Sequence, residues 1–180
     1  MSTEHPNENS LRAPGRIAII DDNPDDIFIL QRQLRRLGVT CPIATFHDGH
    51  NAMTYLKQVS SGHGRKALPD LLFLDINMPG TTGFSVLCWL RDHHATHHLK
   101  VVILSGTSDP GDVALATALT ANSYLAKHAS LTGLLGIVTR LAPHLLPPPL
   151  PPPAVSTNPF AAAVAEALPP PGATATLSAH

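Results

Sequence analysis

The chain has 180 residues with 12 basic and 13 acidic side chains, and its formal net charge of −1 gives no electrostatic reason to expect a nucleic acid or a membrane surface as partner. Residues 143–180 hold 11 of the 18 prolines and one formal charge, Glu166, so composition excludes a second packed domain there. No stretch reaches the roughly 20 apolar residues of a membrane span, and Cys41 and Cys88 form no paired framework. We therefore predict a soluble, cytoplasmic protein with reduced thiols.

Five short apolar runs in the first 142 residues predict five strands, at 17–20, 43–46, 71–74, 101–104 and 124–126. Segments with helical spacing lie between and after them. The first helix is expected to begin at Asn23 and Pro24 and to stop at Gly38; the others are expected at 49–59, 84–93, 110–121 and 130–141. Continuous apolar strands that alternate with helices are typical of a parallel sheet buried on both faces. The predicted class is α/β, doubly wound.

We divide the chain into a flexible N-terminal segment at 1–15, a folded domain at 16–142 and a disordered Pro/Ala-rich tail at 143–180. The segment at 60–66 is expected to be an exposed loop. In the tail, the proline run favours extended polyproline II. Phe160, Val164 and Leu168 could lie on one face of a helix, which would be too short to be stable alone in water.

Polar side chains follow four of the five predicted strands. Asp21 and Asp22 follow the first, Asp75 the third, Ser105 the fourth and Lys127 the fifth. The carboxyl ends of parallel strands meet at one edge of a sheet, so these groups should lie together. Any one such Asp is usually a turn or helix-cap residue, and the argument therefore rests on the set.

That set indicates a particular chemistry. Three crowded carboxylates are tolerable around a divalent cation, and oxygen ligands suit Mg²⁺. A lysine and a hydroxyl on the other side suit a phosphoryl group.

The segments IIDDNPDD, LLFLDINMPG, VVILSGT and SYLAK resemble, in order, the signatures of the receiver domains of two-component response regulators. The resemblance covers about residues 16–141. It implies a flavodoxin-like sheet of five parallel strands in the order 2-1-3-4-5. It implies that Asp75 is the phosphoacceptor and that Lys127 is the cation that pairs with the phosphate. Mg²⁺ would be bound by Asp21, Asp22, Asp75 and the backbone carbonyl of Asn77. Ser105 would be the switch hydroxyl, and Tyr124 the aromatic side chain that rotates on activation.

The resemblance also implies a mechanism. The Asp75 carboxylate would attack a phosphohistidine of a sensor histidine kinase to form an acyl phosphate, and the domain would promote its own phosphorylation and dephosphorylation with Mg²⁺. It would thus be a phosphoacceptor signalling protein and not an enzyme with a separate substrate. Most receivers carry proline after the lysine, whereas this chain has His128. With no effector module in the sequence, this is similar to the small response regulators that serve bacterial phytochromes, so a phytochrome-like kinase is the expected partner and direct DNA binding is not expected.

From Val113 to Ala142 the only formal charges are Lys127 and Arg140, although this span should contain two helices that each expose a face. Such an apolar surface usually marks association. We therefore expect a homodimer through the helix at 110–121, the strand at 124–126 and the helix at 130–141. The alternative is that the tail folds back and covers this surface.

Two other functions remain open on the sequence. One is a phosphate-independent adaptor that uses its apolar face and Pro-rich tail. The other is a Mg²⁺-dependent phosphohydrolase, but that type carries a second Asp two residues after the nucleophile, where this chain has Asn77.

His93 with His97, and His94 with His98, have the i, i+4 spacing of zinc-binding helices. No third ligand is evident nearby, and we expect pH-sensitive surface charge there in place of a metal site.

Overall fold

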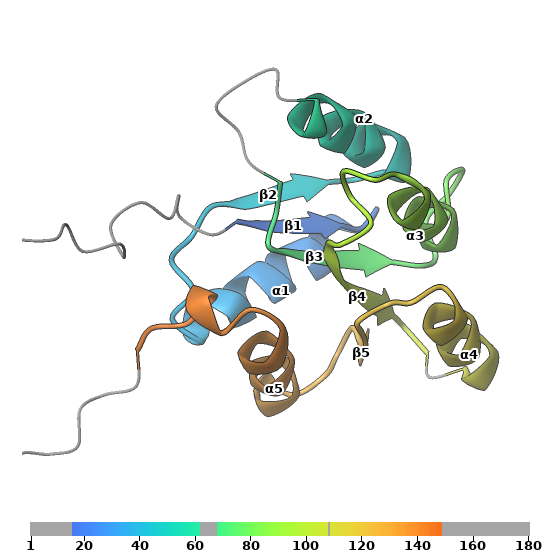
Figure 1. Ribbon diagram of the computed structural model, residues 1–180. Helices are drawn as coiled ribbons and strands as arrows, with labels where there is room; N and C mark the ends of the chain where they lie inside the picture. Colours follow the sequence, from blue (N-terminus) through green and yellow to red (C-terminus); the bar gives the residue numbers. More distant parts are fainter. Residues whose placement is uncertain (1–15, 62–67, 108, 149–180) are drawn as a thin grey trace, which may run out of the picture. The chain divides into compact units, whose positions relative to one another are not determined.

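The computed structural model describes residues 16–61, 68–107 and 109–148 and contains a five-stranded parallel sheet in the order β2-β1-β3-β4-β5 (Figure 1). The strands are β1 (Ile17–Ile20), β2 (Ile43–Phe46), β3 (Leu71–Asp75), β4 (Lys100–Ser105) and β5 (Ser123–Ala126). The helices are α1 (Pro24–Arg36), α2 (Gly49–Ser60), α3 (Gly83–Asp92), α4 (Pro110–Ala118) and α5 (Leu131–Leu141), followed by the 3₁₀ helix η2 (Pro143–Leu145). The α/β class and the strand order predicted from the sequence are confirmed.

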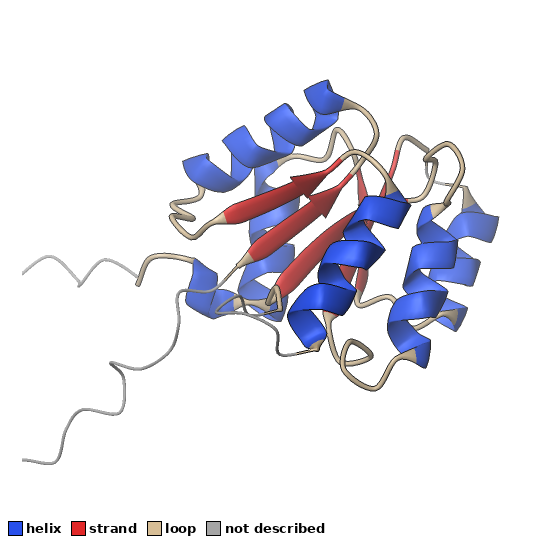
Figure 2. Cartoon of the chain, turned by 90° about the horizontal axis from the view of Figure 1, so that it is seen from above, coloured by secondary structure: helices blue, strands red, loops and turns tan. Residues whose placement is uncertain are grey.

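Helices cover both faces of the sheet, as Figure 2 shows. Along β1, Ile17 and Ile19 pack into a cluster with α1, α5 and η2, whereas Ala18 and Ile20 pack into a second cluster with α2, α3 and α4. Successive side chains of a β-strand point to opposite faces of the sheet, and those on both faces are apolar here because helices cover both faces. All residues of β1 and β3 are buried, whereas the edge strand β2 is half-buried throughout.

Each of the five α-helices begins with a capping side chain that accepts a backbone N–H of the first turn. The capping residues are Asn23, Asp48, Thr82, Asp109 and Ser130. Pro24 and Pro110 occupy the first helical position, where the missing N–H costs no hydrogen bond. These caps start the helices close to the carboxyl ends of the strands and so fix the loops at that edge.

Helix α4 ends earlier than the sequence predicted. We expected it to continue to residue 121, but it ends at Ala118, and Thr120 has a φ of +58°. The N–H of Ala121 binds the carbonyl of Ala116 at 2.9 Å, which satisfies a terminal carbonyl as the chain reverses. A threonine in the left-handed region is an unfavourable choice, so propensity alone did not indicate the stop.

Folded structure continues beyond residue 142, where we expected the tail to begin. Leu145 on η2 is buried in the cluster with α1 and α5, and Leu146 packs against it. Gly38, with a φ of +87°, lies against Pro147, and a Cβ at Gly38 would come within 2.7 Å of that ring. The first tail residues therefore close one end of the core.

The remaining expectations for the ends of the chain, at 1–15 and 149–180 with the Phe160–Leu168 segment, lie outside the described residues, as does most of the loop expected at 60–66. Both cysteines are free. In the part of the chain that the structure describes, none of the helices has the length and apolar character needed to cross a bilayer.

Candidate functional site

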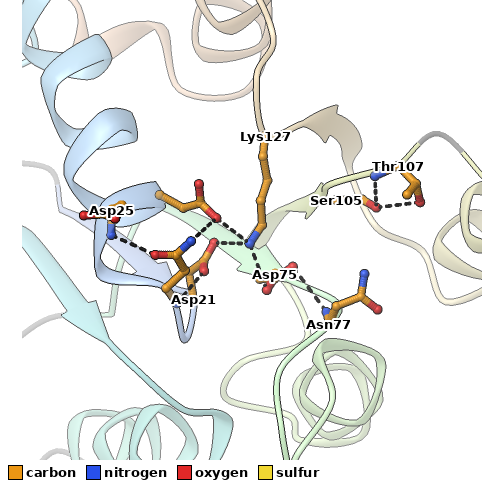
Figure 3. A network of polar contacts seen from close by, with 9 residues as sticks. Asp21, Asp25, Asp75, Asn77, Ser105, Thr107 and Lys127 are labelled. Atoms are coloured by element: carbon orange, nitrogen blue, oxygen red, sulfur yellow. Dashed lines mark hydrogen bonds and ion pairs between the residues drawn. The ribbon is translucent and has the colours of Figure 1, made fainter.

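The strand register brings the chemistry-bearing residues to one edge of the sheet. Ile20 on β1 lies beside Leu74 on β3, so the residues that follow them, Asp21 and Asp75, are neighbours across the two central strands. Lys127 follows β5, and its N–H binds the carbonyl of Ser105 at the end of β4. Figure 3 shows the side chains of Asp21, Asp75 and Lys127 directed toward one another.

Asp21, Asp22 and Asp75 form an acidic cluster in which one ligand oxygen of each lies within 4.8 Å of the others. Asp21 and Asp75 are buried, and Asp22 is exposed. The backbone N–H of Asn23 binds Oδ1 of Asp21 at 3.0 Å, and that of Asn77 binds Oδ1 of Asp75 at 3.2 Å. These local bonds turn the second oxygen, Oδ2, of both buried acids into the site.

The ammonium of Lys127 reaches those oxygens. Its Nζ lies 2.9 Å from Oδ2 of Asp21 and 3.1 Å from Oδ2 of Asp75, and it donates a hydrogen bond of 3.0 Å to Oδ2 of Asp26 on α1. The first two contacts are ion pairs without hydrogen-bond geometry, so neither Oδ2 accepts a hydrogen bond from the described residues. Both oxygens therefore keep lone pairs for another ligand.

The pKa values show how crowded this site is. Burial is the main cause that raises the pKa of Asp21, and the nearby charge of Asp75 adds to it, against the opposing contact with Lys127. Burial alone would lower the pKa of Lys127, but its contacts with Asp21, Asp26 and Asp75 raise it above its ordinary value. Lys127 is charged at neutral pH, and one ammonium does not neutralise the cluster.

A divalent cation fits this donor set. Two buried carboxylate oxygens without hydrogen bonds, and an exposed third carboxylate within 4.8 Å, supply the hard ligands that Mg²⁺ prefers and leave room for water. An added positive charge would also remove the unfavourable ionisation of Asp21.

A glycine positions Asp75. A Cβ at Gly83, the first residue of α3, would overlap the backbone oxygen of Asp75 and come within 2.8 Å of the Cα of Ile76. Only glycine allows α3 to start this close to the end of β3.

Hydroxyl groups lie on the β4 side of the site. Ser105 is buried, and its Oγ accepts the backbone N–H of Thr107 at 3.1 Å (Figure 3). The carbonyl of Thr107 accepts a hydrogen bond of 3.0 Å from the hydroxyl of Tyr124 on β5. Ser105 and Tyr124, both identified from the sequence, are thus linked through Thr107, which was not. The threonine lies in a loop, and its sequence carries no signal of this contact.

Asp26 also escaped the sequence analysis. It lies in the first turn of α1, where acidic residues are common because they favour the helix dipole. Its role as a partner of Lys127 depends on how α1 packs against the β5–α5 loop, which residue spacing does not reveal.

Two other local features can be described. The Lys127–His128 peptide bond is trans. His93, His94, His97 and His98 lie in turns after α3, and none of them joins the acidic cluster, which is the only potential metal-binding group found among the described residues.

Among the residues that the structure describes, the exposed large apolar side chains lie on three helices. Val113 and Leu115 are on α4 and Leu135 is on α5, as the charge depletion indicated. Phe28 and Ile29 on α1 are also exposed, and the sequence analysis did not single them out.

Comparisons with known proteins agree with this geometry. The sequence model of the response regulator receiver domain family matches residues 17–139 of this chain. The chain is 31% identical over 121 residues to a probable methanogenesis regulatory protein, FilR2, of Methanothrix harundinacea, covering 67% of this chain and 77% of that protein. It is 27% identical over 125 residues to the response regulator Rcp1 of Synechocystis sp., covering 69% and 84%.

Solved structures give the same result. The phosphorylated cyanobacterial phytochrome response regulator RcpA is 31% identical, with a TM-score of 0.62 over 72% of this chain and 94% of that one. An Mn²⁺-bound form of Rcp1 is 26% identical, with a TM-score of 0.62, and the match covers 75% of this chain and 100% of that one.

Proposed function

Because this chain belongs to the response regulator receiver domain family of two-component systems, we propose that Asp75 accepts a phosphoryl group from a phosphohistidine of a sensor histidine kinase. The observation that carries the proposal is the buried Asp75 carboxylate, which lies 3.1 Å from Lys127 and beside two further acids. The relatives favour this function over a phosphohydrolase, for which Asn77 is also the wrong residue.

The two oxygens of Asp75 have different surroundings. The N–H of Asn77 holds Oδ1, whereas Oδ2 accepts no hydrogen bond from the described residues and faces the ammonium of Lys127. In the proposed reaction, an oxygen of the Asp75 carboxylate attacks the phosphorus as the phosphorus–nitrogen bond of the phosphohistidine breaks, and the electron pair of that bond leaves with the imidazole. The product is an acyl phosphate, and later attack by water returns the carboxylate and releases inorganic phosphate.

Lys127 and the acidic cluster supply the electrostatics of this transfer. Lys127 pairs with the phosphoryl oxygens as negative charge gathers beside Asp75. Asp21, Asp22 and Asp75, with the backbone carbonyl of Asn77, are the proposed ligands of Mg²⁺. When bound, Mg²⁺ would offset the negative charge of the acceptor and of the transferred group.

The hydroxyl contacts supply a route from the site to the surface. We propose that Ser105 turns its hydroxyl to the new phosphoryl group and gives up its bond to the N–H of Thr107. Thr107 would then move, and its carbonyl would release the hydroxyl of Tyr124. The charge added at Asp75 would thereby change the surface around α4 and β5.

Exposed apolar area supports output through protein contact. Val113, Leu115 and Leu135 expose apolar area on α4 and α5, and a homodimer through α4, β5 and α5 would bury it. The likeness to the cyanobacterial phytochrome response regulator RcpA supports a phytochrome-like kinase as partner. We also propose a cytoplasmic location and no direct DNA contact.

The proposal can be tested with acetyl phosphate, a small phosphodonor that replaces the kinase. Intact-mass measurement should show one added phosphoryl group on the wild type with Mg²⁺, and none after chelation or in Asp75→Asn. A wild type that stays unmodified under conditions that label other receivers would refute it.

A further inference from the structure

Among the described residues, Asp26 is the one acid in contact with Lys127 that does not belong to the acidic cluster. It lies on α1, it is nearly buried with 16% of its side chain exposed, and it lies outside the group of oxygens that could share a cation. Its Oδ2 accepts the hydrogen bond from Lys127 at 3.0 Å and another of 3.1 Å from Nδ2 of Asn23. The amide of the helix cap therefore orients the carboxylate that holds the lysine.

The contacts of the ammonium divide into two kinds. An ammonium has three N–H donors, and three carboxylates lie within 3.1 Å of Nζ. Asp21 and Asp75 are the groups that a cation and a phosphoryl group would engage. Asp26 lies outside the acidic cluster, so a cation bound there would not engage it.

Helix α1 also holds the loop that carries the lysine. Nε2 of Gln33 donates a hydrogen bond of 3.5 Å to the carbonyl of Ala129. The residue after Lys127 is His128, so no proline ring restricts the backbone at that point. Contacts with α1 therefore supply restraint that the loop's own sequence lacks.

We infer that Asp26 is a positioning residue for phosphoryl transfer. It fixes the ammonium of Lys127 before phosphorylation, so that the lysine meets the developing charge without first being ordered. This inference rests on the proposed function of Asp75. Asp26 could also act in the opposite direction, through repulsion. As a fourth carboxylate beside Asp21, Asp22 and Asp75, it would repel an anionic phosphodonor and slow the transfer, so its removal would speed the transfer.

The two effects predict opposite results for Asp26→Asn, which keeps the shape and removes the charge. If Asp26 positions the lysine, the maximal rate of phosphorylation by acetyl phosphate should fall about tenfold, because small displacements of catalytic groups cost about this much or more. The concentration of acetyl phosphate at half-maximal rate should change little. Asp26→Glu, which keeps the charge, should recover part of the rate.

Asp25→Asn is the matched control. Asp25 is the adjacent acid in the same first turn of α1, it is exposed, and its loss removes the same charge from the same helix end. It should be phosphorylated at the wild-type rate. Equal slowing in both variants would mean that the charge at the helix end causes the effect, and it would overturn the inference. A rate in Asp26→Asn that equals or exceeds the wild-type rate would also overturn it.

A second measurement needs no phosphorylation. In the metal-free protein, the ammonium signal of Lys127 in nitrogen-edited NMR, assigned by its loss in Lys127→Gln, should broaden or shift in Asp26→Asn and stay unchanged in Asp25→Asn. An unchanged signal in both variants would contradict the anchoring of Lys127 by Asp26. A wild type that is never phosphorylated would instead refute the role of Asp75, so the two failures can be told apart.

Discussion

Nζ of Lys127 lies 3.1 Å from Oδ2 of Asp75, although their strands, β5 and β3, are separated in the sheet by β4. The lysine follows the last strand and reaches across the end of β4 to the central acid. This contact joins the buried Asp75 carboxylate to the only cation near it in the described part of the chain. It is the structural basis of the predictions below.

Mg²⁺ should stabilise the folded protein through the acidic cluster. A ligand at 100 times its Kd adds about 2.7 kcal/mol to the free energy of unfolding. Thermal unfolding of the wild type should therefore shift upward as Mg²⁺ is added. Asp22→Asn should lose most of this shift without loss of basal stability, because Asp22 is exposed.

Asp92→Asn removes an exposed acid on α3, outside the acidic cluster, and serves as the control. It should respond to Mg²⁺ like the wild type. A full Mg²⁺ shift in Asp22→Asn would remove this residue from the metal site.

Ionisation of Asp21 should reduce the stability of the metal-free protein. Its pKa is raised in the fold, so the folded protein binds this proton more tightly than the unfolded chain does. The free energy of unfolding therefore falls as the pH rises from the ordinary carboxylate pKa, about 4, through the raised pKa. Asp21→Asn, which mimics the neutral acid, should be more stable than the wild type at pH 7, with the difference shrinking below about pH 4. Denaturant titrations in chelator at both pH values measure this, and a variant that is less stable at pH 7 would contradict it.

Gly83→Ala should destabilise the fold and displace the Asp75 backbone, which carries the proposed acceptor. The new Cβ would overlap the backbone of Asp75 and Ile76, and overpacking against backbone typically costs about 1–3 kcal/mol. Gly136→Ala on α5 is the matched control, because a Cβ there meets nothing within 4 Å and alanine favours a helix by about 1 kcal/mol. Chemical denaturation should move in opposite directions for the two variants. If Gly83→Ala leaves the free energy of unfolding unchanged, α3 can shift away from β3 at little cost.

Association should depend on the apolar residues of α4 and α5. Leu115 is 44% exposed on α4, and Leu115→Glu should keep the phosphorylated protein monomeric. Phe28 on α1 is 63% exposed and lies outside the proposed interface, so Phe28→Glu should leave the dimer intact. Light scattering of the two variants after treatment with acetyl phosphate separates these surfaces. Dimer loss in Phe28→Glu alone would move the interface to α1.

The sequence predicted the sheet well because its strands are short, continuous apolar runs. Ile17–Ile20 and Ile43–Phe46 have the predicted bounds, and the strand ends identified Asp21, Asp75 and Lys127. Helix α4 was overextended because its stop depends on Thr120, a residue with no propensity for positive φ. Side-chain partners from other elements were beyond reach: Asp26 and Thr107 join the site only through the packing of α1 and the loop after β4.

The location of the phosphoryl group on Asp75 is the central claim, and it can be read directly. Borohydride reduces an acyl phosphate of aspartate to homoserine, and peptide mass spectrometry then identifies the converted residue. After treatment with acetyl phosphate and Mg²⁺, we predict conversion at Asp75 alone. Conversion at Asp21, Asp22 or Asp26 in place of Asp75, or undiminished labelling of Asp75→Asn, would contradict the account.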